Sequence, residues 1–296
     1  MDLSAHSKVL VQGIAGALGQ LYTGRMQAYG TSIVAGVSSG QGGQTLDGVP
    51  IFDMVEQALQ SVGPIDATVI LVEPYRTLDA ALEAIAAGIR HLVLVTEGVP
   101  PLDMVRLLYA AERTDTLVVG PDSPGIILPG QILLGTYPAE LYSPGRIGLI
   151  SRSGTLTHEI ALHLTQAGLG QSIAVGIGGD RIVGSSFQQW LQILDEDDQT
   201  EAIVLVGEIG GNSEEEAARY IVEAIDKPVI AYIAGRTAPK NQFMGHAGAI
   251  IASLVAGWGS EIGTPDSKFA AFQTADIPVA SRPSDIPHLL QQALRV

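Results

Sequence analysis

Short runs of β-branched and other apolar residues alternate with longer amphipathic stretches along almost the whole chain of 296 residues. The short runs lack a regular alternation of apolar and polar residues, which predicts strands buried on both faces, as in parallel sheets. The longer stretches carry apolar residues three and four positions apart, which is the spacing of amphipathic helices. A repeated βαβ series of this kind predicts an α/β fold.

The same alternation occurs in both halves of the chain. The predicted strands are Val9–Gln12, Ser32–Val37, Ala67–Val72, His91–Thr96, Leu117–Val119, Ile147–Ile150, Ser172–Ile177, Ala202–Val206, Val229–Ile233 and Ile277–Val279. The predicted helices are Leu18–Tyr29, Asp53–Gln60, Thr77–Ala87, Pro101–Arg113, Thr155–Ala167, Ser186–Leu194, Glu214–Ile225, Lys268–Thr274 and Asp285–Leu294. Ser213 followed by Glu216 has the pattern of a capping box, which indicates a helix start at this point.

A stretch rich in proline and glycine interrupts this rhythm near the middle of the chain. We therefore expect a domain at 1–122, a connection at 123–145 and a second domain at 146–296. Two domains also agree with the usual size of about 150 residues per domain.

Charge and composition exclude several classes of protein. The chain has 16 Lys and Arg against 31 Asp and Glu, a formal net charge of −15 with no basic stripe, which disfavours nucleic-acid binding. It has no cysteine, so a disulfide framework and Cys-ligated metal sites are excluded. We see no run long enough to span a membrane and no signal-peptide pattern, and we expect a cytoplasmic protein.

The first predicted strand runs into a glycine-rich turn, with Gly13, Gly16 and Gly19 three positions apart. Glycines between a strand and a helix let backbone N–H groups approach a phosphate at the helix N-terminus, although a tight turn alone also uses them. The second strand leads into Gly36–Gly43, which contains neither the acidic residue that holds an NAD ribose nor an arginine for NADP. The pattern favours another nucleotide-bearing ligand.

Glycines and small residues also follow strands in the second half. Ser151–Thr155 lies between a strand and a helix and can form an anion site, but Ser153 or Thr155 would serve equally well as an ordinary N-cap. Ile177–Asp180 and Gly207–Gly211 follow the next two strands. These turns share the sheet edge at which α/β proteins bind ligands.

Two common phosphate and metal motifs are absent. No P-loop motif occurs. His158 and His163 lie five positions apart, about 140° around a helix, so they cannot share one metal ion. We therefore expect no metal site on this chain. His246 differs from the other histidines because small residues flank it in Met244–Ile250. An accessible neutral imidazole can carry a phosphoryl group, although a histidine in a tight turn can also be structural.

Taken together, these motifs resemble a known family, the α subunits of succinyl-CoA synthetases (ADP- or GDP-forming succinate–CoA ligases). The resemblance runs from about Val9 to Leu294. Its most specific stretches are Ser151–Thr157, Gly176–Asp180, Thr200–Gly211, Glu214–Ala217 and Tyr232–Ile251. It implies a Rossmann-like CoA-binding domain followed by a flavodoxin-like ligase domain.

The resemblance also implies a mechanism and a partner. Succinyl-CoA and phosphate give succinyl phosphate and free CoA, His246 takes the phosphoryl group, and phosphohistidine delivers it to ADP or GDP. The nucleotide and Mg²⁺ would bind an ATP-grasp β subunit, in an αβ or α₂β₂ assembly. Glu208 would accept a hydrogen bond from the His246 imidazole.

By the same resemblance, two groups of residues bind the ligands. The phosphoryl group would lie at the helix N-terminus formed by Ser153, Gly154 and Thr155. CoA would contact three segments, made up of Ala15, Gly16, Ala17, Leu18, Gln41, Val95, Thr96 and Glu97.

The sequence departs from the family pattern at several positions. Gln41 stands where lysine is common, which predicts weaker CoA binding. Asp122 replaces an asparagine near the thioester end, and His158 stands near the acyl substrate where tyrosine is usual. Residues 253–265 contain an insertion.

These departures keep alternatives open. One is a subunit of a related acyl-CoA ligase, such as malate–CoA ligase. A second is a CoA-binding regulatory protein without turnover. A nicotinamide dehydrogenase is a third, disfavoured by the missing ribose acid.

Overall fold

The computed structural model describes residues 2–235 and 263–294. The chain forms two compact units. The first contains the residues up to Ala139 together with Ile182–Ser185, and the second contains Glu140–Arg181 and the residues from Ser186 onward. The segment expected as a connection, 123–145, contains the antiparallel hairpin β8 (Gly125–Leu128) and β9 (Ile132–Gly135). The α/β fold is confirmed in both units.

The strands of the first unit form one sheet in the order β3-β4-β2-β1-β5-β6-β7. Every neighbouring pair is parallel except the short hairpin β3–β4. The strands are β1 (Lys8–Gln12), β2 (Ser32–Val37), β3 (Thr45–Leu46), β4 (Val49–Phe52), β5 (Ala67–Ile70), β6 (His91–Leu94) and β7 (Leu117–Val119). The chain runs outward from β1 to β4 and then restarts at β5 on the other side of β1. This is the strand order of the Rossmann fold, whose ligands bind beside β1 at the carboxyl ends of the strands.

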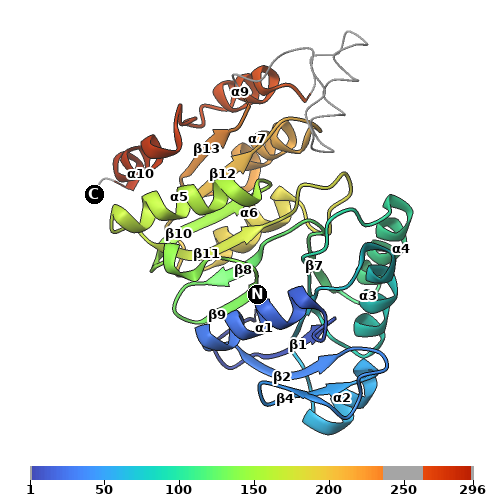
Figure 1. Cartoon of the computed structure of the whole chain (residues 1–296). Coiled ribbons are helices and arrows are strands. Elements are labelled where there is room, and N and C mark those ends of the chain that lie inside the picture. The colour runs from blue at the N-terminus through green and yellow to red at the C-terminus, as the bar shows by residue number, and fades with distance from the viewer. Residues whose placement is uncertain (1, 236–262, 295–296) are drawn as a thin grey trace. The chain divides into compact units, whose positions relative to one another are not determined.

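Helices cover this sheet because its strands are apolar on both faces, and Val9, Leu10 and Val11 are fully buried in β1. The helices are α1 (Ala17–Tyr29), α2 (Val55–Val62), α3 (Thr77–Ala86) and α4 (Pro101–Glu112). Figure 1 shows α3 and α4 side by side. The core beneath α2, α3 and α4 includes Leu92 and Leu107.

Gly19 allows α1 to lie directly on the glycine-rich turn. A Cβ atom at this position would lie 2.1 Å from the Gly13 carbonyl oxygen and 2.8 Å from the Ile14 backbone, whereas a Cβ at Gly24 in the same helix would meet nothing within 4 Å. We expect Gly19→Ala to lower the free energy of unfolding by about 1–3 kcal/mol or more, as overpacking does. The matched change Gly24→Ala should raise it by about 0.5–1 kcal/mol. Urea unfolding of both variants checks this contrast, and equal effects would contradict it.

The parallel strands of the second unit follow the order β11-β10-β12-β13. Their bounds are β10 (Pro144–Ser151), β11 (Gln171–Gly176), β12 (Ala202–Gly207) and β13 (Val229–Ile233). The predicted strand Ile277–Val279 is reduced to one parallel bridge between Val279 and Ala231. Pro278 has no N–H to donate and only accepts a hydrogen bond from Ala231, so the ladder stays short. With this bridge as the fifth member, the order is that of flavodoxin-like folds, whose ligands bind between the first and third strands, here β10 and β12.

The helices of the second unit are α5 (Gly154–Gln166), α6 (Phe187–Glu196), α7 (Ser213–Ala224), α9 (Pro265–Thr274) and α10 (Ile286–Leu294). Helices α5 and α10 pack together, while α7 packs between α6 and α9 (Figure 1). Short 3₁₀ turns occur at Pro74–Arg76, Ala139–Leu141 and Pro283–Asp285. In the part of the chain that the structure describes, no helix combines the length and the apolar character that crossing a membrane requires.

The start of α7 differs from the predicted capping box. The N-cap is Asn212, with Ser213 as the first helical residue, and no side chain caps the helix. The Asn212 amide donates to Glu216 (2.6 Å), and the Ser213 hydroxyl donates to Glu214 (3.1 Å). The prediction of a reciprocal box was wrong because Ser213 lies one position inside the helix and its hydroxyl bonds a side chain.

Candidate functional site

The glycine-rich turn after β1 presents the N-terminus of α1 at the edge of the first sheet. Gly13 donates its N–H to Val37 (2.8 Å), and Gly16 donates to Gly13 (3.0 Å). Gly16 is the N-cap, and no side chain caps the helix. Ala17 and Leu18 are exposed in the first turn. Backbone N–H groups at an open helix N-terminus attract anions, so this turn can hold a phosphate.

The predicted contact residue Gln41 lies in the loop after β2, and Asp53 determines the shape of that loop. One Asp53 carboxylate oxygen accepts hydrogen bonds from Gly40 N (2.7 Å) and Gly42 N (3.0 Å), while Gln41 N donates to Ser38 (3.0 Å). A Cβ at Gly42 would lie 2.4 Å from the Asp53 carboxylate. The loop is therefore built around a carboxylate, and the half-buried Gln41 comes between these two glycines in the sequence. No motif in the sequence pointed to Asp53.

The third predicted segment, Val95–Glu97, follows β6 at the same sheet edge. Val95 N donates to Ile70 (3.2 Å), and the Thr96 hydroxyl donates to Val72 (2.7 Å), so the segment is tied to the end of β5. Asp122 N donates to Thr96 (2.9 Å), which places the acidic departure from the family pattern beside this segment. The structure thus brings all three predicted CoA segments to the carboxyl edge of one sheet.

The N-terminus of α5 is the corresponding feature of the second unit. Ser153 is the N-cap, and its hydroxyl accepts a hydrogen bond from Leu156 N (3.4 Å). Its own N–H donates to the Ser151 hydroxyl (3.0 Å). The ordinary N-cap interpretation therefore holds for the Ser153 side chain. Gly154 and Thr155 are exposed, and a Cβ at Gly154 would meet nothing within 4 Å, so the first turn of α5 also offers open space for an anion.

Glu208 follows β12, the strand that pairs with β10. Because Ser151 is opposite Val206 in this pair, Ser153 and Glu208 each lie two residues beyond the last paired level. Glu208 and the N-terminus of α5 thus leave neighbouring strands at the point where flavodoxin-like sheets bind ligands. The residues on which the resemblance places phosphoryl chemistry are brought together here, except His246, which lies outside the described residues.

A buried group of charged residues lies behind Glu208. We call Arg152, Glu208, Glu214 and Lys268 the charge cluster. Glu214 and Lys268 are fully buried and form an ion pair. Arg152 Nη1 donates to Glu214 (3.2 Å), and Arg152 Nη2 lies 3.9 Å from a Glu208 carboxylate oxygen. The sequence did not predict this cluster, because Glu214 and Lys268 occupy what look like ordinary charged positions on amphipathic helices.

Glu214 is ionised within the charge cluster. Burial by itself raises the pKa of its carboxyl group, but the positive charges of Lys268 and Arg152 outweigh burial and hold that pKa below its usual range. Hydrogen bonds from Lys268 and from the Glu208 backbone act in the same direction. For Lys268, burial lowers the pKa of the ammonium group, and the charge of Glu214 opposes this shift.

His158, the predicted substrate contact, faces Tyr142 on the second unit. Its Nδ1 lies 2.9 Å from the Tyr142 hydroxyl, and the two rings meet edge to face. Burial lowers the pKa of His158, against the opposing charge of Glu140. The imidazole is therefore neutral at pH 7 and has one ring nitrogen bonded to tyrosine.

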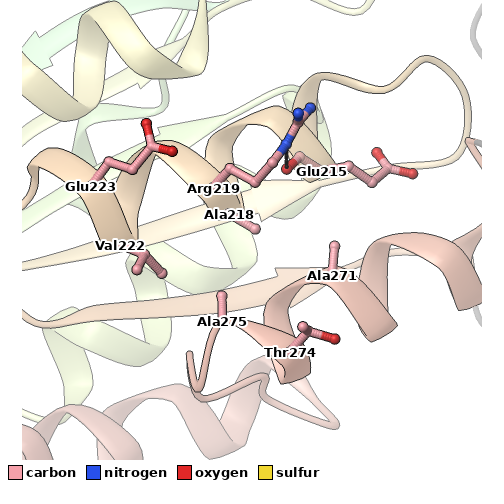
Figure 2. Close-up of a pocket in the computed structure, with 8 residues that line it drawn as sticks. All are labelled: Glu215, Ala218, Arg219, Val222, Glu223, Ala271, Thr274 and Ala275. Atoms are coloured by element: carbon pink, nitrogen blue, oxygen red, sulfur yellow. Dashed lines mark hydrogen bonds between the residues drawn. The ribbon is translucent and has the colours of Figure 1, made fainter.

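Three further points concern a metal site, the predicted insertion and a groove. Within 2–235 and 263–294, no group of three or more His, Asp or Glu side chains could hold a metal ion. Residues 253–262 of the predicted insertion lie outside the described residues. A groove of about 450 Å³ lies between α7 and α9, and Figure 2 shows the side chains that line it. It is lined by Glu215, Ala218, Arg219, Val222, Glu223, Ala271, Thr274 and Ala275, and none of the predicted site residues is among them.

Comparisons with known proteins find a different family in each half of the chain. Residues 4–98 match the CoA binding domain family, and residues 150–261 match the CoA-ligase family. Succinate–CoA ligase (ADP-forming) subunit alpha 2 of Archaeoglobus fulgidus is 46% identical over 97% of this chain and 97% of its own length. The corresponding alpha subunit of Aquifex aeolicus is 43% identical over 98% of this chain and 93% of its own length.

Two solved structures share the fold. The ATP citrate lyase of Methanothrix soehngenii superposes on all of this chain with a TM-score of 0.87 at 24% identity, and this chain spans about half (50%) of that protein. The dinucleotide-forming acetyl-coenzyme A synthetase 1 of Candidatus Korarchaeum cryptofilum covers 95% of this chain with a TM-score of 0.71 at 21% identity, and 59% of that protein is matched.

Proposed function

The chain belongs to the family of α subunits of ADP-forming succinate–CoA ligases, and we propose that its two units bind CoA and carry the phosphoryl group in that reaction. It is a CoA ligase subunit with CoA as a substrate. The observation that carries the proposal is the placement of Glu208 beside the open N-terminus of α5, at the ends of two paired strands.

The proposed reaction has three reversible steps. Phosphate attacks the thioester carbonyl of succinyl-CoA, which gives succinyl phosphate and releases CoA as its thiol. A ring nitrogen of His246 then attacks phosphorus, so the P–O bond to succinate breaks and succinate leaves. Finally ADP attacks the phosphohistidine, which gives ATP and restores the neutral imidazole.

Two features of the second unit support the middle step. The first turn of α5, at Ser153–Thr155, supplies backbone N–H groups and the positive end of a helix dipole for the phosphoryl oxygens. The Glu208 carboxylate, as acceptor of a hydrogen bond from the His246 ring, would fix the imidazole tautomer and stabilise positive charge on the ring.

Glu208→Gln is expected to slow phosphoenzyme formation by about 100-fold, since a neutral amide stabilises the imidazolium much less than a carboxylate. CoA affinity should stay unchanged, because the predicted CoA segments belong to the first unit. Rapid-quench measurement with Mg-ATP and the β subunit gives the rate, and calorimetry gives the affinity. Glu159→Gln, at an exposed position of α5, serves as the matched control. An unchanged rate in Glu208→Gln would remove its proposed role.

The first unit would bind CoA through the turn at Ala15–Leu18, the Gln41 loop and the Val95–Glu97 segment. Gln41→Lys is expected to tighten CoA binding by up to about fivefold, since one exposed charge pair contributes up to about 1 kcal/mol. Calorimetric titration with CoA measures this, with Gln60→Lys on the exposed part of α2 as the control for net charge. Equal affinity of wild type and Gln41→Lys would show that this loop does not face the phosphates of CoA.

The named relatives are α subunits, so a partner subunit is expected. We propose that the partner is an ATP-grasp β subunit that binds Mg²⁺ and ADP, in an αβ or α₂β₂ assembly in the cytoplasm. The absence of a P-loop motif from the chain supports nucleotide binding on the partner.

A further inference from the structure

We propose that Arg152 is a positioning residue that holds the Glu208 carboxylate in place, and that the buried Glu214–Lys268 pair in turn holds Arg152. This inference rests on the proposed role of Glu208 in the phosphoryl-transfer site. It concerns Arg152, directly after β10, together with Glu214 of α7 and Lys268 of α9, none of which belongs to the catalytic residues that the resemblance implies.

Arg152 occupies the space between the two carboxylates. Its side chain is only 9% exposed. Nη1 donates to the Gly210 carbonyl (3.0 Å) and to Glu214 (3.2 Å), and Nη2 lies 3.9 Å from Glu208. The planar guanidinium can reach both carboxylates because its donors form a rigid fork, which the single ammonium of lysine cannot reproduce.

Glu214 fixes both the backbone and the side-chain surroundings of Glu208. The same Glu214 oxygen that accepts from Arg152 also accepts from Glu208 N (3.1 Å). A Cβ at Gly207 would lie 2.5 Å from Glu214 Cγ, so the glycine allows this close approach. The position of Glu214 thus determines where the chain leaves β12 and where the guanidinium lies.

Lys268 fixes Glu214 from α9. Its ammonium group pairs with Glu214 and donates to the Gly210 carbonyl (2.7 Å), which Arg152 also contacts. Glu215 extends the connection, because it accepts from the Ser267 hydroxyl (2.8 Å). The Glu208–Gly211 turn is therefore attached to the start of α9 through buried charge-assisted hydrogen bonds, which are stronger than neutral ones.

The charge cluster balances two cations against two carboxylates. With Arg152 in place, the Glu208 carboxylate faces a fixed positive charge that favours one orientation. Without the guanidinium, Glu208 loses this fixed positive neighbour. The expected consequence is slower phosphoryl transfer with unchanged CoA binding, because the CoA segments lie in the other unit.

A double-mutant cycle on the assembled αβ enzyme tests the proposal. Arg152→Lys should slow phosphoenzyme formation from Mg-ATP by about 10- to 100-fold, the range for residues that orient a site. In a Glu208→Gln background, the same change should cost no more than a further twofold, because the carboxylate that Arg152 positions is gone. Arg152→Gln provides a second variant should the lysine variant fail to fold. Arg146→Lys, on β10 and paired with the exposed Glu201, is the matched control.

The outcomes separate this proposal from the proposed function. Two results would overturn the role of Arg152 even if Glu208→Gln slows the reaction as proposed. One is that the rate losses of the two single variants multiply in the double variant, and the other is that Arg152→Lys forms the phosphoenzyme at the wild-type rate. If Glu208→Gln itself leaves the rate unchanged, the role of Glu208 fails and the positioning role fails with it. The unfolding temperature and the CoA affinity of each variant are measured as well. A general loss of structure would lower both of them together.

Discussion

Lys268→Met is expected to lower the free energy of unfolding by about 3–5 kcal/mol, the usual cost of removing one member of a buried ion pair. Glu214 and Lys268 are both fully buried, so the carboxylate would remain without its nearest countercharge and without water. Arg152 would still contact Glu214 and offset part of the loss. For a domain of ordinary stability, this change removes a large share of the total free energy of unfolding.

Chemical denaturation of Lys268→Met, Glu214→Gln and the double variant measures the effect. The double variant should be more stable than the sum of the two single losses predicts, since neither charge is then left alone. A loss below about 1 kcal/mol in Lys268→Met would contradict the account of the charge cluster. The same outcome would also weaken the inference that Lys268 supports Arg152.

The loss of stability caused by Lys268→Met should become smaller as the pH falls. Because the pKa of Glu214 is lower in the folded protein than in the unfolded chain, its contribution is complete above the ordinary glutamate pKa and is lost as the pH falls through the folded value. The stability difference between wild type and Lys268→Met should therefore narrow in acid. A difference that grows as the pH falls would contradict the assignment of Glu214 as an ionised group.

His246→Ala is expected to abolish net formation of succinyl-CoA, the largest effect on activity that we predict. Alanine has no nucleophilic nitrogen, so the phosphoryl group of ATP has no acceptor on the chain and cannot be passed on to succinate. CoA binding and thermal stability should stay close to wild type. Steady-state assays with the β subunit give the activity, and His163→Ala on α5 is the histidine control. Turnover within tenfold of wild type in His246→Ala would contradict the proposed route.

Most of the fold could be predicted because the pattern of apolar residues follows from burial. Continuous apolar runs are typical of strands covered on both faces, and apolar residues three and four positions apart are typical of the helices that cover them. The strands Ser32–Val37, Leu117–Val119 and Val229–Ile233 have the predicted bounds. The hairpin β3–β4 was missed, although its Asp47–Gly48 turn has left-handed backbone angles that this pair of residues favours. Strands this short give little periodic signal, so the Asp47–Gly48 pair was the feature that could have predicted this hairpin.

The candidate site could be predicted only in part. Glycine-rich turns after strands indicated which loops gather at the sheet edges, since these positions follow from topology. Asp53 and Lys268 were not predicted, because their roles depend on contacts with residues distant in sequence. A lysine in an amphipathic helix is usually solvated, and only the tertiary structure shows Lys268 fully buried against Glu214.

The most direct test of the central proposal is intact-mass spectrometry of the chain, co-expressed with its β subunit and incubated with Mg-ATP. We expect an acid-labile gain of one phosphoryl group in wild type and in His163→Ala, and no gain in His246→Ala. Peptide mapping under alkaline conditions should place the group on His246. A wild-type chain that binds CoA but gains no phosphoryl mass, or a His246→Ala chain that is labelled normally, would contradict the phosphohistidine mechanism.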